Sequence, residues 1–270
     1  LRVDARSGFA YPAISAAIEG LAECAPETGI AAASVTNSHH FGIGGYHAER
    51  LADRGLVGLV FGNSPKAVAP WAGRGALYGT NPIAFAAPRE HQPALVIDLS
   101  LSVAARGKIM VAAARGEPIP EGWALDPEGN PTTDAALGSK GTMLPLGGYK
   151  GYGLALMFSF LTAALSGNGF DAEQPDWLDA DHTFALPLLA IAIDPGRCLG
   201  GDYQAAVDDA VCQVKASRLA PGFDEIRIPG EGAHRRYAAA LESGVAIKEA
   251  VFGDLNRIAA EVDATPLAAS

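Results

Sequence analysis

The sequence predicts an α/β fold, because short apolar strands alternate along it with amphipathic helices. Two runs, 55–62 and 186–193, are almost continuously apolar and end at glycine or at aspartate and proline, as is typical of buried strands. In 11–25 the apolar residues recur at steps of three and four, which is the helical period. With 270 residues, 49% of them hydrophobic, the chain can bury the core of one large domain or of two small ones.

The elements are expected in an order that places a sheet beside a helical layer. The strands are expected at 29–36, 55–62, 83–88, 95–100, 186–193 and, as a last short strand, 226–231. The helices are expected at 11–25, 46–54, 103–115, 154–165, 202–219 and from 234 onward, with a terminal helix within 245–258. The helix 154–165 has little polar face, so it should be buried or lie at a subunit interface.

Composition excludes several classes of protein. The net charge of −10 argues against a nucleic-acid partner, because phosphate neutralisation needs a basic face. Cys24, Cys198 and Cys212 are widely scattered, so neither a disulfide framework nor a metal site is expected. No apolar run reaches the roughly 18 residues of a membrane span, and 1–6 lack the apolar segment of a signal peptide. We therefore expect a cytoplasmic protein with no membrane partner.

The stretch 31–50 organises the rest of the chain. It predicts a buried strand, then a turn at Asn37 and Ser38, then a glycine-rich corner that opens a helix. Free N–H groups at such a corner can face a phosphate. His39 and His40 lie on it as an adjacent pair, although an isolated loop histidine is more often a surface residue. The glycines lack the spacing of the dinucleotide fingerprint.

Five corners of polar residues and glycine interrupt apolar segments, which is the pattern that a dinucleotide with its phosphates, riboses and rings requires. Each corner also has a purely structural explanation: Asp98 can cap the next helix, Lys150 can be a solvated loop residue, and Arg106 can lie on a helix surface. Thr80 with Asn81 can form an ordinary turn before proline. The corners are 38–44, 63–64, 79–82, 98–100 and 148–151.

Longer motifs make the pattern recognisable, and they resemble the type-2 malate/L-lactate dehydrogenase family, which includes sulfolactate and ureidoglycolate dehydrogenases. The resemblance covers nearly the whole chain. The motifs are Asn37-Ser-His-His-Phe-Gly, Gly79-Thr-Asn-Pro-Ile-Ala-Phe-Ala-Ala-Pro, Ala105-Arg-Gly-Lys-Ile, Pro118-Ile-Pro-Glu-Gly-Trp-Ala-Leu-Asp and Gly147-Gly-Tyr-Lys-Gly-Tyr-Gly-Leu-Ala-Leu-Met.

The family fold is not a Rossmann fold. The resemblance implies a mixed-sheet nucleotide-binding domain, made of 1–102 with 171–233, and a helical domain, made of 103–170 with 234–270. It also implies a homodimer with the cofactor near the subunit interface, NAD or NADP as cofactor, and a small 2-hydroxy or 2-oxo acid as substrate.

The resemblance assigns roles to individual residues. His40 matches a histidine that accepts a proton, and it can do so at neutral pH from its ordinary pKa of about 6.5. Thr80, Arg106 and Gly107 match substrate contacts, and an arginine can hold a carboxylate with two parallel hydrogen bonds. The cofactor contacts are matched by His40, Phe41, Gly42, Ile43, Gly44, Ser64, Asp98, Leu99, Ser100, Tyr149, Lys150, Gly151, Pro229, Gly230 and Glu231.

Two departures from the family pattern bear on the reaction. Relatives usually carry an upstream helical Ser-His-Gly motif that Arg6-Ser7-Gly8 does not replace, so we expect a truncated chain or an incomplete active site. In the branch that reduces cyclic imines, an aspartate stands where this chain has Lys108. The lysine therefore favours a hydroxy acid as the substrate. Asp176-Trp177 resembles that imine branch, so reduction of piperideine or pyrroline carboxylate stays open. Nucleotide binding without turnover is a third possibility, and a purely structural role is the least favoured.

Overall fold

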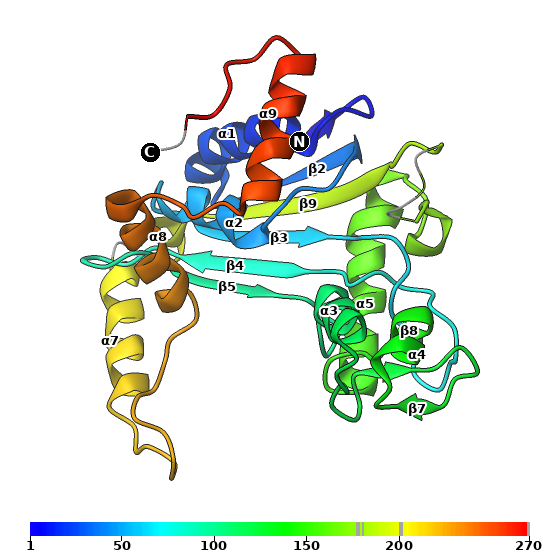
Figure 1. Ribbon diagram of the computed structural model, residues 1–270. Helices are drawn as coiled ribbons and strands as arrows, with labels where there is room; N and C mark the ends of the chain where they lie inside the picture. Colours follow the sequence, from blue (N-terminus) through cyan, green and yellow to red (C-terminus); the bar gives the residue numbers. More distant parts are fainter. Residues whose placement is uncertain (177–178, 180, 200–201, 269–270) are drawn as a thin grey trace. The chain divides into compact units, whose positions relative to one another are not determined.

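The computed structural model describes residues 1–176, 179, 181–199 and 202–268. They divide into two compact units, Leu1–Gly230 and Glu231–Ser270. The first unit is built on one six-stranded sheet (Figure 1). Its strand order is β1 (Arg2–Asp4), β2 (Ile30–Ser38), β9 (Leu186–Ile193), β3 (Val57–Gly62), β4 (Ile83–Ala87) and β5 (Leu95–Leu99).

The sheet is mixed, as predicted. Only the pair β1–β2 is parallel, and the other four neighbouring pairs are antiparallel. The α/β class is therefore confirmed. The strand expected at 226–231 is wrong: this segment forms no ladder, and Ile228 is buried from an irregular loop. β1 was not expected, because three residues carry too little periodicity to indicate a strand.

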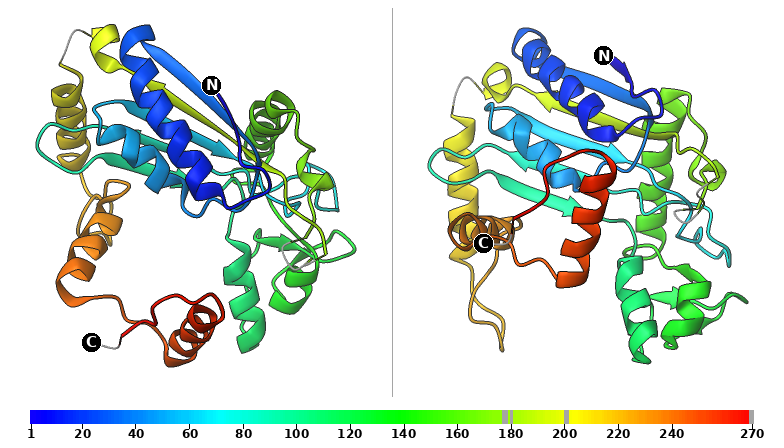
Figure 2. Two further views of the ribbon diagram at one scale, coloured as in Figure 1. Left: turned by 90° about the horizontal axis from the view of Figure 1, so that it is seen from above. Right: turned by 45° about the horizontal axis from the view of Figure 1, so that its top comes forward.

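Two helices, α1 (Ala10–Thr28) and α2 (Gly44–Ala52), cover one face of the sheet (Figure 2). The apolar stripe of α1, which includes Ile14, Ile18 and Leu21, is fully buried there. It joins Val60 of β3 in one apolar core. This burial is the reason why the helical period was readable from the sequence.

The opposite face is covered by α5 (Tyr149–Ser159) and the π-helical turn that continues it, η1 (Phe160–Ala164). Neighbouring residues on a strand point to opposite faces. Phe61 therefore lies in the core on this side, whereas Val60 lies in the core on the other side. The ring of Phe61 packs edge-on against Phe158, with 5.0 Å between the ring centroids.

A small lobe follows β5 in the chain and has a core of its own. It is made of α3 (Arg106–Arg115), β6 (Ala124–Leu125), β7 (Pro131–Thr132), α4 (Ala135–Lys140) and β8 (Thr142–Met143), of which the strands form a three-stranded sheet. Its core contains Ile109, Ile119 and Met143, together with Val68 from the segment before β4.

The remaining elements are short or peripheral. In the first unit they are η2 (Asp171–Glu173), α6 (Pro195–Leu199) and α7 (Tyr203–Lys215), and the second unit holds α8 (Glu231–Ser243) and α9 (Glu249–Glu261). Within the described residues, no helix combines the length and the apolar character needed to cross a bilayer. Two predicted boundaries move: the helix expected from 103 begins at Arg106, and the helix expected from 154 begins at Tyr149.

Candidate functional site

The ends of five strands meet at one edge of the sheet. β2 and β3 finish there, since Ser38 pairs with Leu186 at the start of β9 and Gly62 pairs with Leu188. β4 begins at the same edge, where its Ile83 pairs with Phe61. β5 ends there too, with its Leu99 opposite Ile83. The loops that follow or precede these strands, far apart in sequence, therefore lie side by side.

A cavity of about 370 Å³ opens among these loops. Six predicted site residues line it, and they come from four different segments: His40, Phe41 and Gly42 after β2, Ser64 after β3, Thr80 before β4 and Arg106 at the start of α3. Apolar side chains, including Met110, complete the wall. The structure thus brings together one imidazole, two hydroxyls and one guanidinium.

The imidazole of His40 is oriented by the glycine corner. The backbone N–H of Gly42 donates a hydrogen bond of 2.9 Å to His40 Nδ1. Because Nδ1 accepts this bond, the neutral ring carries its proton on Nε2. Burial lowers the pKa of His40 below its ordinary value of 6.5, and the neighbouring His39 lowers it further. The ring is therefore uncharged at neutral pH.

The two hydroxyls form a continuous polar wall. The backbone N–H of Thr80 donates to Ser64 Oγ at 2.9 Å, and the two hydroxyl oxygens lie 3.3 Å apart. This approach requires glycine at position 79, since a Cβ there would overlap the backbone oxygen of Ser64. The polar corners 63–64 and 79–82 are thus joined to each other by hydrogen bonds between Ser64 and Thr80.

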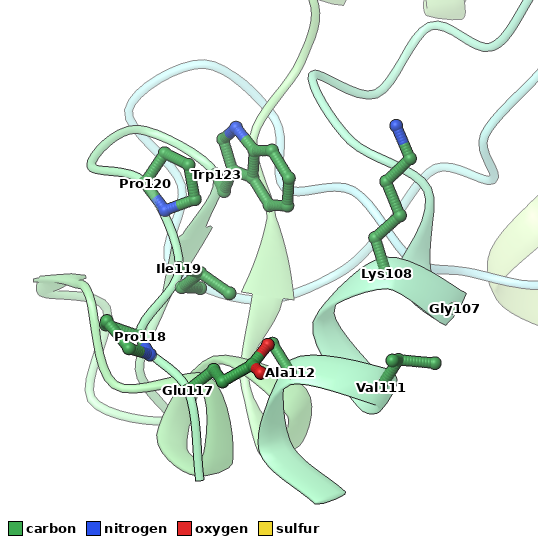
Figure 3. Close-up of a pocket in the computed structure, with 9 residues that line it drawn as sticks. All are labelled: Gly107, Lys108, Val111, Ala112, Glu117, Pro118, Ile119, Pro120 and Trp123. Atoms are coloured by element: carbon green, nitrogen blue, oxygen red, sulfur yellow. The ribbon is translucent and has the colours of Figure 1, made fainter. Parts of the chain in front are cut away.

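Arg106 and Gly107 were both predicted to contact substrate, but the structure places them at different cavities. Arg106 is exposed to solvent, and no carboxylate in the described part of the chain pairs with it. Gly107 lines a second cavity of about 420 Å³ (Figure 3). There, Lys108 and Val111 of α3 line the cavity together with Trp123.

The glycine corner is less open to anions than its sequence suggested. Gly45 donates its backbone N–H to Asp98 Oδ2 at 2.7 Å, so this carboxylate caps the N-terminus of α2. The amide of Gly42 is already bonded to His40. Two of the N–H groups expected to be free for a phosphate are therefore occupied. The capping role that was considered for Asp98 exists, but it is directed to α2 and not to the helix that follows β5.

The predicted cofactor residues of segments 98–100 and 149–151 do not line the cavity, but the backbone connects these segments to it. Leu101, just after Ser100, donates its N–H to the carbonyl oxygen of Thr80 at 2.8 Å and accepts from Leu146 at 2.7 Å. At the start of α5, Gly151 is so close to the carbonyl oxygen of Leu146 that a Cβ would overlap it. Segments 98–101 and 144–151 are thus neighbours of the Thr80 wall.

Of the last predicted segment, Pro229–Glu231, the residue Gly230 lies against β5. The backbone of Gly230, which has a φ of +91°, lies against Val96, and a Cβ there would come within 3.1 Å of that residue's carbonyl oxygen. Tyr149 and Lys150 are exposed on α5, and Glu231 begins the second unit. Trp177, part of the motif similar to the imine-reducing branch, lies outside the described residues.

Asp171, which lies behind the cavity and is 1% exposed, was not predicted from the sequence. Its carboxylate accepts hydrogen bonds from Asn63, Gly79, Asn81 and Ser159. A lone aspartate in a loop resembles any surface carboxylate in sequence, so only the fold reveals its position.

One residue of the cavity wall carries a buried acceptor that is unsatisfied. Asn63 lines the cavity, is 2% exposed, and has a buried Oδ1 with no donor among the described residues. A buried acceptor without a donor is costly, so a ligand that brings an N–H group is complementary to it. A nicotinamide carboxamide has such a group, and the residues present therefore fit this cofactor.

The fold and the cavity together define an α/β protein with a polar site at one sheet edge. The family model of malate/L-lactate dehydrogenase matches residues 1–256. The (2R)-3-sulfolactate dehydrogenase (NADP(+)) of Chromohalobacter salexigens is 44% identical over 262 residues, which are 96% of this chain and 76% of that protein. The chain belongs to the malate/L-lactate dehydrogenase family, and the predicted family is confirmed.

Two further relatives indicate the range of this family. The Delta(1)-pyrroline-2-carboxylate/Delta(1)-piperideine-2-carboxylate reductase of Pseudomonas putida is 41% identical over 255 residues, 92% of this chain and 72% of that one. The solved structure of the sulfolactate dehydrogenase of Methanocaldococcus jannaschii matches with a TM-score of 0.89 and 32% identity, over 97% of this chain and 76% of that one. The predicted non-Rossmann fold is confirmed by this match.

Proposed function

We propose that this chain is an NAD(P)-dependent oxidoreductase that interconverts a small 2-hydroxy acid and its 2-oxo acid, of the malate, lactate or ureidoglycolate type. One observation carries the proposal: His40, Ser64, Thr80 and Arg106 line a single cavity. The relatives named above act on substrates of this class or on cyclic imino acids.

The substrate carboxylate pairs with the guanidinium of Arg106, which has no other anionic partner in the described part of the chain. The oxygen on the neighbouring carbon lies against His40 and the hydroxyl of Thr80. In its resting tautomer, His40 donates a hydrogen bond from Nε2 and polarises the carbonyl group of a 2-oxo acid.

Proton exchange with the substrate takes place at His40 Nε2. To accept the hydroxyl proton, the ring must carry its other proton on Nδ1, so the hydrogen bond from Gly42 must open first. The Gly42 amide thus favours the uncharged ring, in the same direction as burial. A bound nicotinamide supplies the hydride chemistry.

The residues proposed to hold the nucleotide are those of the corner 40–44, with Ser64, the segment 98–100, and the start of α5 with its exposed Lys150. The loop at Pro229–Glu231 completes the set. Support comes from the backbone links that join Thr80 to Leu101 and Leu146. With this set we propose the division into a nucleotide-binding domain of 1–102 with 171–233 and a helical domain of 103–170 with 234–270.

Reduction of a cyclic imino acid is the second candidate, and the Pseudomonas putida reductase supports it. Within this chain, Lys108 lines the cavity on the other side of α3 and does not line that of His40. Lys108 therefore takes no part in the proton exchange proposed above. Its position favours a hydroxy acid over a cyclic imino acid as the substrate.

We also propose a cytoplasmic homodimer. Along α5 and the turn after it, Leu154, Met157, Phe160 and Leu165 are each at least 41% exposed. A contiguous apolar surface of this kind is characteristic of a protein–protein interface. The three cysteines are free thiols, as is usual in a reducing compartment.

The test is a spectrophotometric assay of NADH and NADPH oxidation with a panel of 2-oxo acids and two cyclic imino acids. We expect turnover with at least one 2-oxo acid, and a loss of about a hundredfold or more in the His40→Ala variant. Turnover with the imino acids alone would favour the second candidate. Calorimetric nucleotide binding without any turnover would support a binding protein and refute the proposal.

A further inference from the structure

A buried carboxylate stands behind the cavity without a cation to balance it. Asp171 begins the short helix η2 and is 1% exposed. Its Oδ2 accepts hydrogen bonds of 2.9 Å from the Gly79 amide, the Asn81 side chain and the Ser159 hydroxyl. Its Oδ1 accepts one of 3.0 Å from the Asn63 side chain. No ion pair with Asp171 is found among the described residues, so these four donors replace its lost hydration.

Three of these donors are direct neighbours of cavity residues. Asn63 precedes Ser64, and Gly79 and Asn81 flank Thr80 on either side. Asp171 itself does not line the cavity. The carboxylate thus holds both loops from behind, while Ser64 and Thr80 face the ligand space.

The loop that Asp171 holds is not one that the chain adopts freely. Asn81 has a φ of +36°, in the left-handed region that is unfavourable for residues other than glycine. Its side-chain amide donates to the Ala155 carbonyl and to Asp171, and it also contacts the Ser159 hydroxyl. Such strain persists only where the surroundings fix the conformation.

This arrangement also limits the hydrogen bonds that the two hydroxyls of the wall can make. The Thr80 amide donates to Ser64 Oγ, and the proton of the Ser64 hydroxyl has two acceptors within reach, the Pro65 carbonyl oxygen at 3.2 Å and Thr80 Oγ1. When it is donated to Thr80 Oγ1, 3.3 Å away, the proton of the Thr80 hydroxyl is left for a ligand. Thr80 then acts as a donor toward a substrate oxygen.

We propose that Asp171 is a positioning residue, which fixes the Ser64–Thr80 wall so that Thr80 donates to the organic acid bound in the cavity. This inference rests on the proposed function. It assigns to Asp171 an effect on substrate binding that acts through Thr80 and involves no contact with the ligand.

The test is a double-mutant cycle that combines Asp171→Asn with Thr80→Val. The amide of an asparagine keeps the shape of aspartate, but it has one acceptor oxygen and turns an NH₂ group toward donors. We expect Asp171→Asn to raise the KM for the preferred 2-oxo acid about tenfold or more, because a small displacement of a positioning group has large effects. In the double variant, the loss in kcat/KM should be no larger than in Thr80→Val alone, since both changes remove the same contact.

The matched control is Asp208→Asn. Asp208 is also a mostly buried carboxylate, bonded to Arg89 and to the Glu90 amide at a distance from the cavity. Its loss should lower the unfolding temperature and leave KM unchanged. If Asp171→Asn behaves in the same way, or if its effect simply adds to that of Thr80→Val, the inference is wrong.

Two further measurements keep the test decisive. If Asp171→Asn does not fold, Ser159→Ala removes one donor from behind the cavity and should raise KM in the same direction by a smaller factor. An unchanged KM in that variant would overturn the inference. Hydrogen exchange, read in the absence of substrate, should be faster at the amides of Gly79 and Thr80 in the Asp171 or Ser159 variant. Lack of turnover in the unmodified protein would refute only the proposed function, whereas unchanged exchange would refute the positioning role.

Discussion

Replacing Asp98 by alanine separates two roles of one carboxylate, the helix cap seen in the structure and the nucleotide contact proposed for it. The cap is the hydrogen bond of 2.7 Å from the Gly45 amide to Asp98 Oδ2. Loss of such a cap costs about 1 to 2 kcal/mol, including the interaction of the charge with the helix dipole. Asp98 is exposed to solvent, so the effect should diminish at high salt.

For a unit of the size of Leu1–Gly230, this loss corresponds to a fall in unfolding temperature of about 2 to 8 °C. The control is Asp134→Ala. Asp134 caps α4 in the small lobe by accepting from the amides of Ala136 and Leu137. Both variants should lower the unfolding temperature, measured by circular dichroism.

Only Asp98→Ala should also weaken nucleotide binding, since Asp98 Oδ1 accepts no hydrogen bond among the described residues and is available to a ribose hydroxyl. Titration of NADH or NADPH fluorescence should show a Kd raised about fivefold or more, the range of a single hydrogen bond. An unchanged unfolding temperature would show that the Asp98 cap does not stabilise the protein by the expected amount. A lower unfolding temperature with an unchanged Kd would limit Asp98 to the cap.

The other predictions concern three further positions. Arg106→Met should raise the KM for the organic acid about ten- to a hundredfold, the range of a charge-assisted hydrogen bond, whereas Lys108→Met should leave it unchanged; equal effects would place the substrate elsewhere. Gly151→Ala should destabilise the protein by about 2 kcal/mol or more, because the new Cβ overlaps a backbone oxygen. Gly153→Ala in the same helix meets no atom and should be neutral or stabilising in the same denaturant titration. For hydroxy-acid oxidation, kcat/KM should rise with pH as His40 loses its proton. The midpoint should lie below pH 6.5, because burial lowers the pKa of His40. A midpoint above pH 6.5 would contradict the assignment of His40 as the proton acceptor.

The elements with strong local patterns could be predicted from the sequence. The apolar stripe of α1 and the continuous apolar runs of β3 and β9 follow from the periods of helix and strand, which are properties of neighbouring residues. The strand expected at 226–231 failed for the same reason: a few alternating residues look alike in a strand and in a loop that buries one side chain.

The residues of the candidate site were predicted, and their corners were expected to share one nucleotide pocket, but the strand pairing that joins them was not predicted. His40, Ser64 and Thr80 lie in polar corners that interrupt apolar segments, and the resemblance to the family assigned roles to these three residues and to Arg106. That they share one cavity depends on the antiparallel pairing of β9 with both β2 and β3, which brings distant strand ends to one edge.

From its order of residues alone, this chain reveals its class, its family and the polar corners from which a site can be built. Three findings depend on tertiary contacts alone. Gly107 lines a second cavity, Asp98 caps α2, and Asp171 lies behind Thr80. The physical reason is the range of the interactions. Periodicity and turn chemistry act between residues a few positions apart, whereas the bonds of Asp171 join it to residues up to 108 positions away, and no local pattern records them.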